Sequence, residues 1–312
     1  MKKSKEQRMK DVLIIGGGPA GLSAAIYAAR AGLDFAIIEQ MAAGGQAATT
    51  QHIENYPGFA EGIGGVELAM AMQTQAENLG APFLYEQVQK MELLGAEKKI
   101  ITEGQTLTAR SVVLAMGARP RPLGLQGEEE LRGKGISYCA TCDGFFYKNK
   151  EAAVIGGGDT ALEDALYLAK FCKQVTLIHR RNEFRAAGRL QEKVRKLENV
   201  KLLTPYRPVA FEQEDGYVSG LTIEHAKTGQ TEHVCCEGIF IAAGTLPQTQ
   251  LVNGQVALDE AGYIKTDAYK RTNVPGVFAA GDISTTPLRQ VVTACADGAV
   301  AISGVEAFLI QQ

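Results

Sequence analysis

Two cysteines stand at Cys139 and Cys142, and an aspartate follows directly at Asp143. Two thiols at this spacing can close a small disulfide, and such pairs have the thiolate character that thiol–disulfide exchange requires. Asp143 is then a proton donor to a leaving thiolate or a reduced cofactor. Its alternative is a plain turn residue before Gly144. We predict that Cys139, Cys142 and Asp143 form a catalytic group.

The alternative for the cysteine pair is half of a zinc site, which needs two further Cys or His ligands at suitable spacing. Cys235 and Cys236 are adjacent and would point to opposite faces of a strand, so they are poor joint ligands. We therefore predict no metal. The remaining cysteines are expected to be small buried hydrophobic residues: Cys172, Cys235, Cys236 and Cys295.

A glycine-rich loop, Gly16-Gly17-Gly18-Pro19-Ala20-Gly21, follows the short apolar run at 12–15. In a G-x-G-x-x-G loop the first glycine makes a tight turn, the second lets the backbone approach a pyrophosphate, and the third allows close helix–strand packing. The next helix presents unpaired N–H groups to the diphosphate. The alternative is a plain glycine turn in an α/β sheet. The residues predicted to bind a dinucleotide are Gly16, Gly18, Pro19, Ala20 and Gly21.

The same unit recurs after residue 150, where an apolar run at 152–155 leads into Gly156-Gly157-Gly158-Asp159-Thr160-Ala161. In both copies the residue that ends the second strand stands 23 positions after the first glycine (39 − 16 and 179 − 156). This duplication predicts a second dinucleotide loop. Its expected binding residues are Gly156, Gly158, Asp159 and Thr160.

The residue at the end of the second strand distinguishes the two copies. Glu39 can accept hydrogen bonds from both ribose hydroxyls and would repel a 2′-phosphate, so the first site suits FAD or NAD. His179, Arg180, Arg181 and Arg185 stand at the matching place in the second copy. Planar guanidinium groups suit a phosphate dianion, which favours NADPH there. The alternative is a solvated basic surface turn.

The elements that must position these residues belong to the α/β class. Strands are expected at 12–15, 35–39, 152–155 and 175–178, and helices at 22–31, ended by Gly32, and about 162–171. Between and after them, short alternating runs predict small antiparallel layers at 99–102, 111–116, 202–203, 219–224, 232–243 and 263–265. The segments 119–122 and 244–247 are expected to be paired crossings between domains.

Composition narrows the class of protein. A length of 312 residues suggests two domains, and a net charge of −3 gives no global attraction to nucleic acid or an anionic membrane. Six unevenly spaced cysteines suit a reducing compartment. Residues 1–10 read as a flexible basic tail, and the apolar run after it is too short for a signal peptide or membrane span. We expect a cytoplasmic protein without nucleic-acid or membrane partners.

Two nucleotide folds with one redox CxxC resemble the low-molecular-weight, bacterial-type thioredoxin reductases of the pyridine nucleotide–disulfide oxidoreductase family. Two departures from the usual pattern are Met116, where many relatives carry threonine, and Cys295, where alanine is usual. Further matching segments are Gly44-Gly45-Gln46, Asn55-Tyr56-Pro57-Gly58, 138–147, Gly276-Val277-Phe278-Ala279-Ala280-Gly281-Asp282 and Arg289-Gln290-Val291.

The resemblance implies a fold of two Rossmann-like domains, with an NADPH domain (118–245) that carries the CxxC inserted into an FAD domain (11–117 plus 246–312). It implies a homodimer, and a domain rotation with hinges near Ala118 and Gly244. It places Asp282 toward the ribityl chain of FAD and Cys142 beside the flavin. Besides the first loop, the implied FAD-site residues are Glu39, Gln40, Gly44, Gly45, Gln46, Asn55, Ala115, Gly117, Gly281, Asp282, Arg289, Gln290 and Val291.

The function implied is NADPH-dependent reduction of the disulfide of thioredoxin through FAD and a redox-active Cys139–Cys142 disulfide. Phe145, Phe146 and Tyr147 are either core residues or a docking surface for the partner. One alternative is a reductase of a peroxiredoxin or another small redox protein. Another is a ferredoxin-dependent flavin thioredoxin reductase, a branch that lacks the NADPH elements. The third is a non-catalytic flavin- or nucleotide-sensing module, which would not need the CxxC.

Overall fold

The computed structural model describes residues 9–50 and 52–312. The chain divides into two compact units, a first unit of the chain up to Arg119 with Leu246–Gln312, and a second unit of Pro120–Thr245. Of the expected tail at 1–10, residues 1–8 lie outside the described residues. Lys10 does not belong to a tail, because it begins strand β1 and its ammonium lies 2.6 Å from Asp34.

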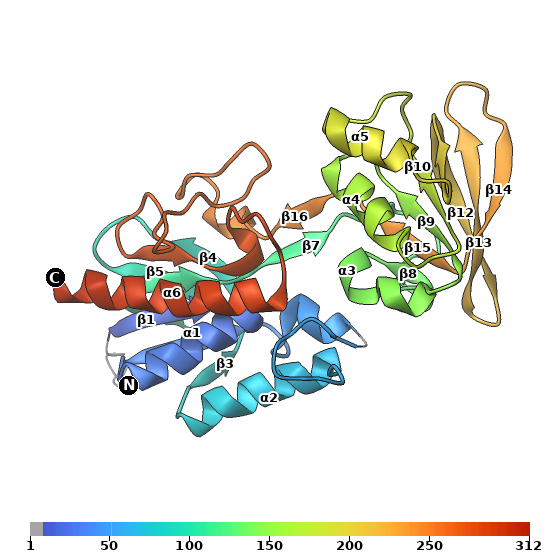
Figure 1. The fold of residues 1–312 in the computed structure, drawn as a ribbon. Coiled ribbons are helices and arrows are strands. Elements are labelled where there is room, and N and C mark those ends of the chain that lie inside the picture. The colour runs from blue at the N-terminus through green and yellow to red at the C-terminus, as the bar shows by residue number, and fades with distance from the viewer. Residues whose placement is uncertain (1–8, 51) are drawn as a thin grey trace. The chain divides into compact units, whose positions relative to one another are not determined.

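The first unit is built on a sheet whose central strand, β1 (Lys10–Ile15), is buried on both faces (Figure 1). Val12 and Ile14 face one core and Leu13 and Ile15 face the other, because side chains alternate along a strand. The parallel strands run in the order β3 (Phe83–Tyr85), β2 (Phe35–Glu39), β1, β6 (Thr106–Leu114), and β17 (Val277–Ala279) also pairs with β6. The antiparallel strands β5 (Lys98–Thr102) and β4 (Val88–Glu92) extend the sheet beyond β6.

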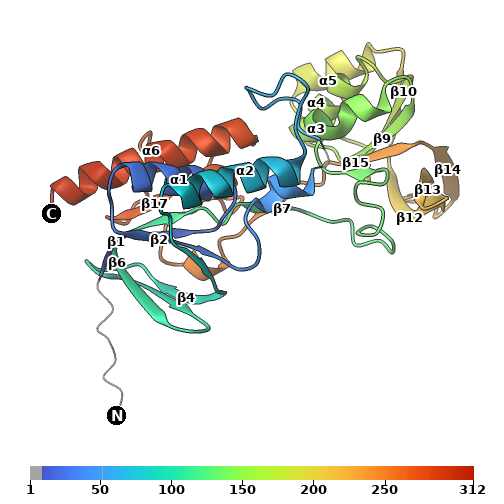
Figure 2. The same cartoon turned by 90° about the horizontal axis from the view of Figure 1, so that it is seen from below.

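Three helices cover one face of this sheet, as Figure 2 shows. They are α1 (Pro19–Arg30), α2 (Gly65–Asn78) and α6 (Val291–Ile310). Helix α1 begins at Pro19, earlier than expected, because Gly18 caps it and proline suits the first helical position. It ends at the expected place, where Gly32 adopts a φ of +68°.

Helix α6 is, within residues 9–50 and 52–312, the one helix that is long and apolar enough to cross a membrane by length and composition. Packing inside the first unit accounts for part of this apolar character, because Ala301, Ile302 and Val305 are buried in the same core as α1. At Gly298 the two helices meet so closely that an added Cβ would lie 2.1 Å from the carbonyl oxygen of Ala20.

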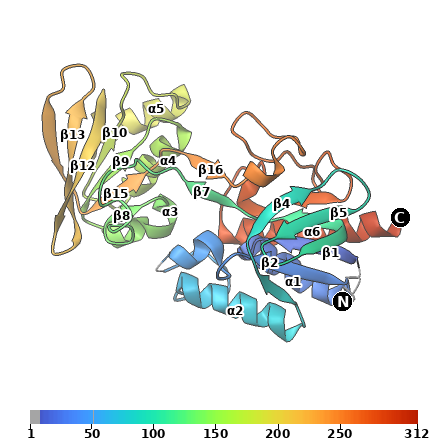
Figure 3. The same cartoon turned by 180° about the vertical axis from the view of Figure 1, so that it is seen from behind.

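The second unit is a parallel sheet with different layers on its two faces (Figure 3). Its strand order is β11 (Val200–Leu203), β10 (Gln174–Ile178), β9 (Glu151–Ile155), β15 (Gly238–Ile241), β8 (Ile136–Ser137). Helices α3 (Ala140–Asp143), α4 (Asp159–Leu168) and α5 (Gly188–Arg195) and the turn η2 (Gly144–Tyr147) pack on one face. A three-stranded antiparallel sheet, β12 (Tyr206–Glu214), β13 (Tyr217–His225) and β14 (Thr231–Cys235), covers the other.

The expectation of small antiparallel layers is correct only in part. The strands at 111–116 and 202–203 belong to the parallel sheets, as β6 and β11. The run at 232–243 is two strands in different sheets, β14 and β15, and 263–265 forms only isolated bridges at Ile264. A strand such as β15, buried on both faces, lacks the polar positions that would reveal its sheet.

The two connections between the units pair with each other as short strands. They are β7 (Ala118–Pro120) and β16 (Thr245–Pro247). The N–H of Gln248 donates to the carbonyl of Gly117 at 3.0 Å, and that of Arg121 donates to Gly244 at 2.9 Å. The expected pairing of the two crossings is thus confirmed.

The contact of α6 with α1 gives a test of the packing. We expect Gly298→Ala to lower the free energy of unfolding by about 1–3 kcal/mol, although alanine favours a helix by about 1 kcal/mol over glycine, because its methyl group overlaps α1. The control is Gly188→Ala in α5, where an added Cβ meets nothing within 4 Å. Urea unfolding of both variants measures the difference; equal stability would contradict the described contact.

Candidate active site and dinucleotide loops

The first glycine loop has no room for side chains at two positions and is open at a third. A Cβ at Gly16, whose φ is +105°, would lie 2.5 Å from the carbonyl oxygen of Ala115. At Gly21 it would lie 1.8 Å from the carbonyl oxygen of Gly16. At Gly18 the nearest atom would be the Cα of Gly45, at 3.9 Å. The open side at Gly18, just before α1, fits the approach of a diphosphate to the helix N-terminus.

Glu39, at the end of β2, is held against this loop by the backbone. Its Oε2 accepts the N–H of Gly17 at 2.7 Å, and its Oε1 accepts those of Gln40 and Met41 at 2.8 and 3.2 Å. The N–H of Gly44 donates to the carbonyl of Gly17 at 2.7 Å. The segment at 44–46 therefore lies beside the loop, and the carboxylate has a fixed orientation that suits ribose hydroxyls.

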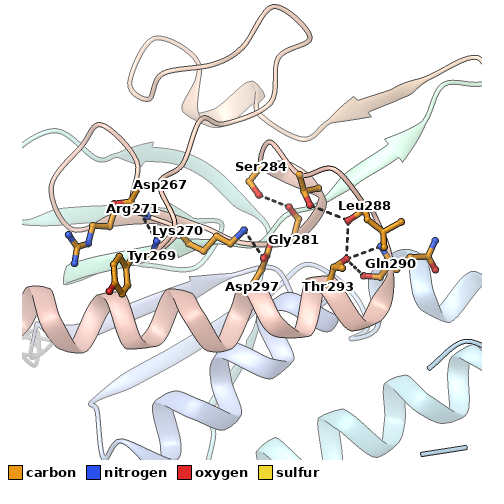
Figure 4. A network of polar contacts seen from close by, with 11 residues as sticks. Asp267, Tyr269, Lys270, Arg271, Gly281, Ser284, Leu288, Gln290, Thr293 and Asp297 are labelled. Carbon is orange, nitrogen blue, oxygen red and sulfur yellow. Dashed lines mark hydrogen bonds and ion pairs between the residues drawn. The ribbon is translucent and has the colours of Figure 1, made fainter. Parts of the chain in front are cut away.

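Gly281 lies against the start of α1, because its added Cβ would be 2.9 Å from the Cβ of Ala20. Its N–H donates to Oδ2 of Asp297 at 3.1 Å, and Lys270 Nζ lies 2.6 Å from the other oxygen (Figure 4). Burial raises the pKa of the next residue, Asp282, against the attraction of Arg289. This turn therefore meets the glycine loop at the carboxyl ends of the strands, where nucleotide sites form in such sheets.

The start of α6 adds further residues beside the first glycine loop and the turn at 281–282. Gln290 and Thr293 cap the helix reciprocally, and Asn55 donates to the Gln290 side chain at 3.0 Å. The guanidinium of Arg289 stacks over the Tyr263 ring at 4.2 Å, and its buried Nε lacks a hydrogen-bond partner within the part of the chain that the structure describes. An unpaired buried donor fits a site whose ligand supplies acceptors.

The second glycine loop, at 156–161, resembles the first, with a crowded glycine and an open glycine. A Cβ at Gly156 would lie 2.5 Å from the Ala242 carbonyl oxygen, whereas Gly158 faces open space. The carbonyl of Gly157 accepts the N–H of Arg185 at 2.7 Å, and Asp159 Oδ1 accepts that of Ala187 at 2.8 Å. The backbone therefore ties the arginine segment to the loop. The arginines Arg180, Arg181 and Arg185 are exposed.

His179 differs from its arginine neighbours because it is buried. Its ring covers Gly157, where an added Cβ would lie 2.3 Å away, and stacks on Phe184 with centroids 5.4 Å apart. Burial, followed by the neighbouring arginines, lowers the pKa of His179. We conclude that a neutral His179 supports the loop, whereas the positive charge comes from the arginines.

The cysteine pair is a disulfide between Cys139 and Cys142, at the start of α3. Sulfurs joined in this way are not thiolate ligands for zinc. Ser137 Oγ donates to Asp143 Oδ2 at 2.7 Å and accepts the N–H of Cys139 at 3.0 Å. Burial raises the pKa of Asp143, opposed by Ser137 and by Arg132. Asp143 can therefore keep a proton to higher pH than an exposed carboxyl.

Of the aromatic residues after the disulfide, Phe145 and Phe146 are exposed, by 51% and 45%. Tyr147 packs edge-on against Phe240, with centroids 5.3 Å apart. The core reading therefore holds for Tyr147, whereas the two phenylalanines present apolar surface.

The expectation that the other cysteines are buried holds for Cys172 and Cys236. It is wrong for Cys235, which is exposed because its side chain lies on the outer face of β14. Cys295 is half-buried, and its sulfur lies 3.8 Å from the Tyr56 hydroxyl.

The sequence reading missed residues that orient the predicted ones: Ser137 beside Asp143, Asp297 and Lys270 behind Gly281, and Tyr263 under Arg289. Ser137 and Asp297 lie close in sequence to predicted residues, which is a weak signal. Lys270 and Tyr263 lie in loops that are distant in sequence from the predicted residues, and no sequence signal identifies them.

The comparisons agree with this arrangement. The family described as Pyridine nucleotide-disulphide oxidoreductase matches residues 10–298. The chain is 46% identical to the thioredoxin reductase of Peptoclostridium acidaminophilum, covering 97% of this chain and 98% of that protein. The thioredoxin reductase structure from Streptococcus pyogenes is 44% identical, with a TM-score of 0.90 and coverage of 97% and 99%.

A ferredoxin-flavin thioredoxin reductase from Clostridium acetobutylicum is 29% identical, with a TM-score of 0.53 and coverage of 97% and 99%. The fold class and the relationship implied by the motifs are thus confirmed. This chain belongs to the pyridine nucleotide-disulphide oxidoreductase family, and within it to the thioredoxin reductases.

Proposed function

We propose that this chain is an NADPH-dependent flavoprotein, a thioredoxin-disulfide reductase that acts through its Cys139–Cys142 disulfide. Its family implies a flavin and a pyridine nucleotide. FAD and NADPH are our specific assignments. The observation that carries the proposal is the disulfide beside a half-buried Asp143 whose pKa is raised by burial, in the same unit as a glycine loop that accepts the backbone N–H of Arg185.

The two cofactors are assigned to the two units. The first unit would hold FAD by its glycine loop, Glu39 and the turn at 281–282, with Arg289 and Gln290 toward the ring system. The second would hold NADPH by Gly156–Thr160 and the arginines. When bound, FAD supplies two-electron transfer between the nicotinamide and the disulfide.

The chain's own groups then carry the exchange with the partner. In the reduced pair, the Cys139 thiolate attacks the disulfide of thioredoxin, and a mixed disulfide forms as the partner's own S–S bond breaks. Cys142 attacks the Cys139 sulfur and releases reduced thioredoxin, which restores the Cys139–Cys142 bond. Asp143 gives its proton to a departing thioredoxin thiolate and is protonated again by solvent, which supplies the one proton that the overall reduction consumes.

The partner and setting belong to the same proposal. Exposed Phe145 and Phe146 next to the disulfide support a docking site for thioredoxin. We also propose a cytoplasmic homodimer, with the two crossings as hinges of a domain rotation. The arginine segment bonded to the second loop favours NADPH over ferredoxin as the electron source.

Mixing the FAD-loaded protein with NADPH, and then adding thioredoxin and a disulfide reporter, tests the whole proposal. We expect NADPH to bleach the flavin absorbance and thioredoxin to be reduced repeatedly. Bleaching without thioredoxin turnover would point to another partner, such as a peroxiredoxin. No bleaching by NADPH would contradict the electron source.

The arginines give a prediction on cofactor choice. Replacing Arg180, Arg181 and Arg185 by alanine should raise KM for NADPH by about 10- to 100-fold, because charge-assisted hydrogen bonds to the 2′-phosphate are lost. KM for NADH, which has no such phosphate, should change little. Arg189→Ala, an exposed arginine on α5, is the matched control. Equal increases in KM for NADPH and NADH would show that the arginines do not bind the 2′-phosphate.

Asp143 gives a prediction on pH. Since its pKa is raised, the protonated, donating form persists at low pH and is lost as pH rises through that pKa, so kcat should fall over that range. Asp143→Asn should lower kcat by about 10²-fold and abolish this limb of the profile. Burial also raises the pKa of Asp164 on α4, to about 7. The Asp164→Asn control should still show the fall of kcat with rising pH. If this fall disappears in Asp164→Asn, the titrating group is Asp164 and not Asp143.

A further inference from the structure

The outer face of the three-stranded sheet carries a second group of reactive side chains, separate from the residues used above. It consists of Glu212 on β12 and of His233 and Cys235 on β14. Glu212 and Cys235 both lie opposite Gly220 of β13, so the three strands place them in one row on one face. His233 stands two residues before Cys235 and shares that face.

The side chains form a continuous relay. His233 Nδ1 lies 2.6 Å from Glu212 Oε2, and its Nε2 lies 3.1 Å from Cys235 Sγ. Because Nδ1–H donates to the carboxylate, Nε2 is the acceptor that faces the thiol. Thr222 Oγ1 donates to the other oxygen of Glu212 at 2.6 Å and fixes the carboxylate. A base that touches a thiol and is itself oriented by a third group is the arrangement that activates cysteine nucleophiles.

Gly220 leaves the room that this relay occupies. A Cβ there would lie 3.1 Å from Cε1 of His233 and 3.4 Å from Oε2 of Glu212. Glycine inside a strand weakens it and often marks a place where other groups approach closely. Here the approaching groups are the imidazole and the carboxylate.

Cys235 and His233 are accessible to solvent, whereas the neighbouring thiol, Cys236, is not. Cys235 is exposed, and the His233 side chain is 51% exposed. Cys236 is buried on the opposite face, in the core with Leu221 and Ile239. A mixed disulfide formed at Cys235 is therefore out of reach of Cys236 and would persist.

We propose that Cys235 is an S-thiolation site, at which the protein forms a mixed disulfide with a small soluble disulfide. The thiol gives its proton to His233, and Glu212 stabilises the imidazolium. The thiolate attacks one sulfur of the small disulfide, whose S–S bond breaks. The released thiolate takes the proton from His233, so a protein thiol and a disulfide become a mixed disulfide and a free thiol.

The test uses the oxidised, FAD-loaded protein without NADPH, so that Cys139 and Cys142 remain a disulfide. The probe is bis(2-hydroxyethyl) disulfide at pH 6.5, with adduct formation followed by intact mass and located by peptide mapping. We expect one adduct, at Cys235. It should form at least about fivefold faster than on an unfolded 231–237 peptide in which Cys236→Ser leaves one thiol.

His233→Gln should reduce the rate to that of the peptide, since glutamine cannot take the proton, and Glu212→Gln should slow it by a smaller factor. Cys235→Ser should abolish the adduct, whereas Cys295→Ser should leave the rate unchanged. Circular dichroism checks that each variant is folded. A wild-type rate equal to the peptide's, an unchanged rate in His233→Gln, or an adduct on another cysteine would each overturn the proposal.

Discussion

Contact between backbone and backbone, with no side chain between, is the constraint on which both glycine loops depend. In the first unit the Gly21 Cα lies against the carbonyl of Gly16, and Gly16 itself against that of Ala115. In the second, Gly156 meets Ala242 in the same way. These contacts fix the angle at which each helix leaves its strand. The two groups of predicted dinucleotide-binding residues are positioned relative to these two turns.

The two glycine loops have similar backbone geometry, but the side chains beside them differ. In the first, a carboxylate receives three backbone N–H groups and stands ready for hydroxyls. In the second, a buried neutral histidine supports the loop, and the flanking arginines face solvent. The difference arises from the residues at the strand end, because the backbone bonds around the two loops are alike.

Much of this could be predicted, because loops and CxxC pairs are local patterns whose chemistry depends on residues close in sequence. Glu39 and the arginines are predicted from their fixed distance in sequence after the first glycine of each loop. Gly32 is predicted because glycine commonly ends a helix. Ser137, Lys270 and Tyr263 could not be found in this way, because tertiary contacts alone give them their roles. The exposure of Cys235 was missed for a related reason. The adjacent Cys235 and Cys236 must point to opposite faces of a strand, but which of the two faces solvent depends on the pairing of β13 with β14 and on the core beneath them.

The paired crossings β7 and β16 have a consequence for the order in which the protein can be made. The second unit lies between them as one unbroken stretch of chain, whereas the first unit needs β17 and α6, which a ribosome would deliver last. Until then, the edge of β6 that β17 occupies stays unpaired, and the side of α1 that packs against α6 stays uncovered. During synthesis, therefore, the unit that begins first in the chain is the one that finishes folding second.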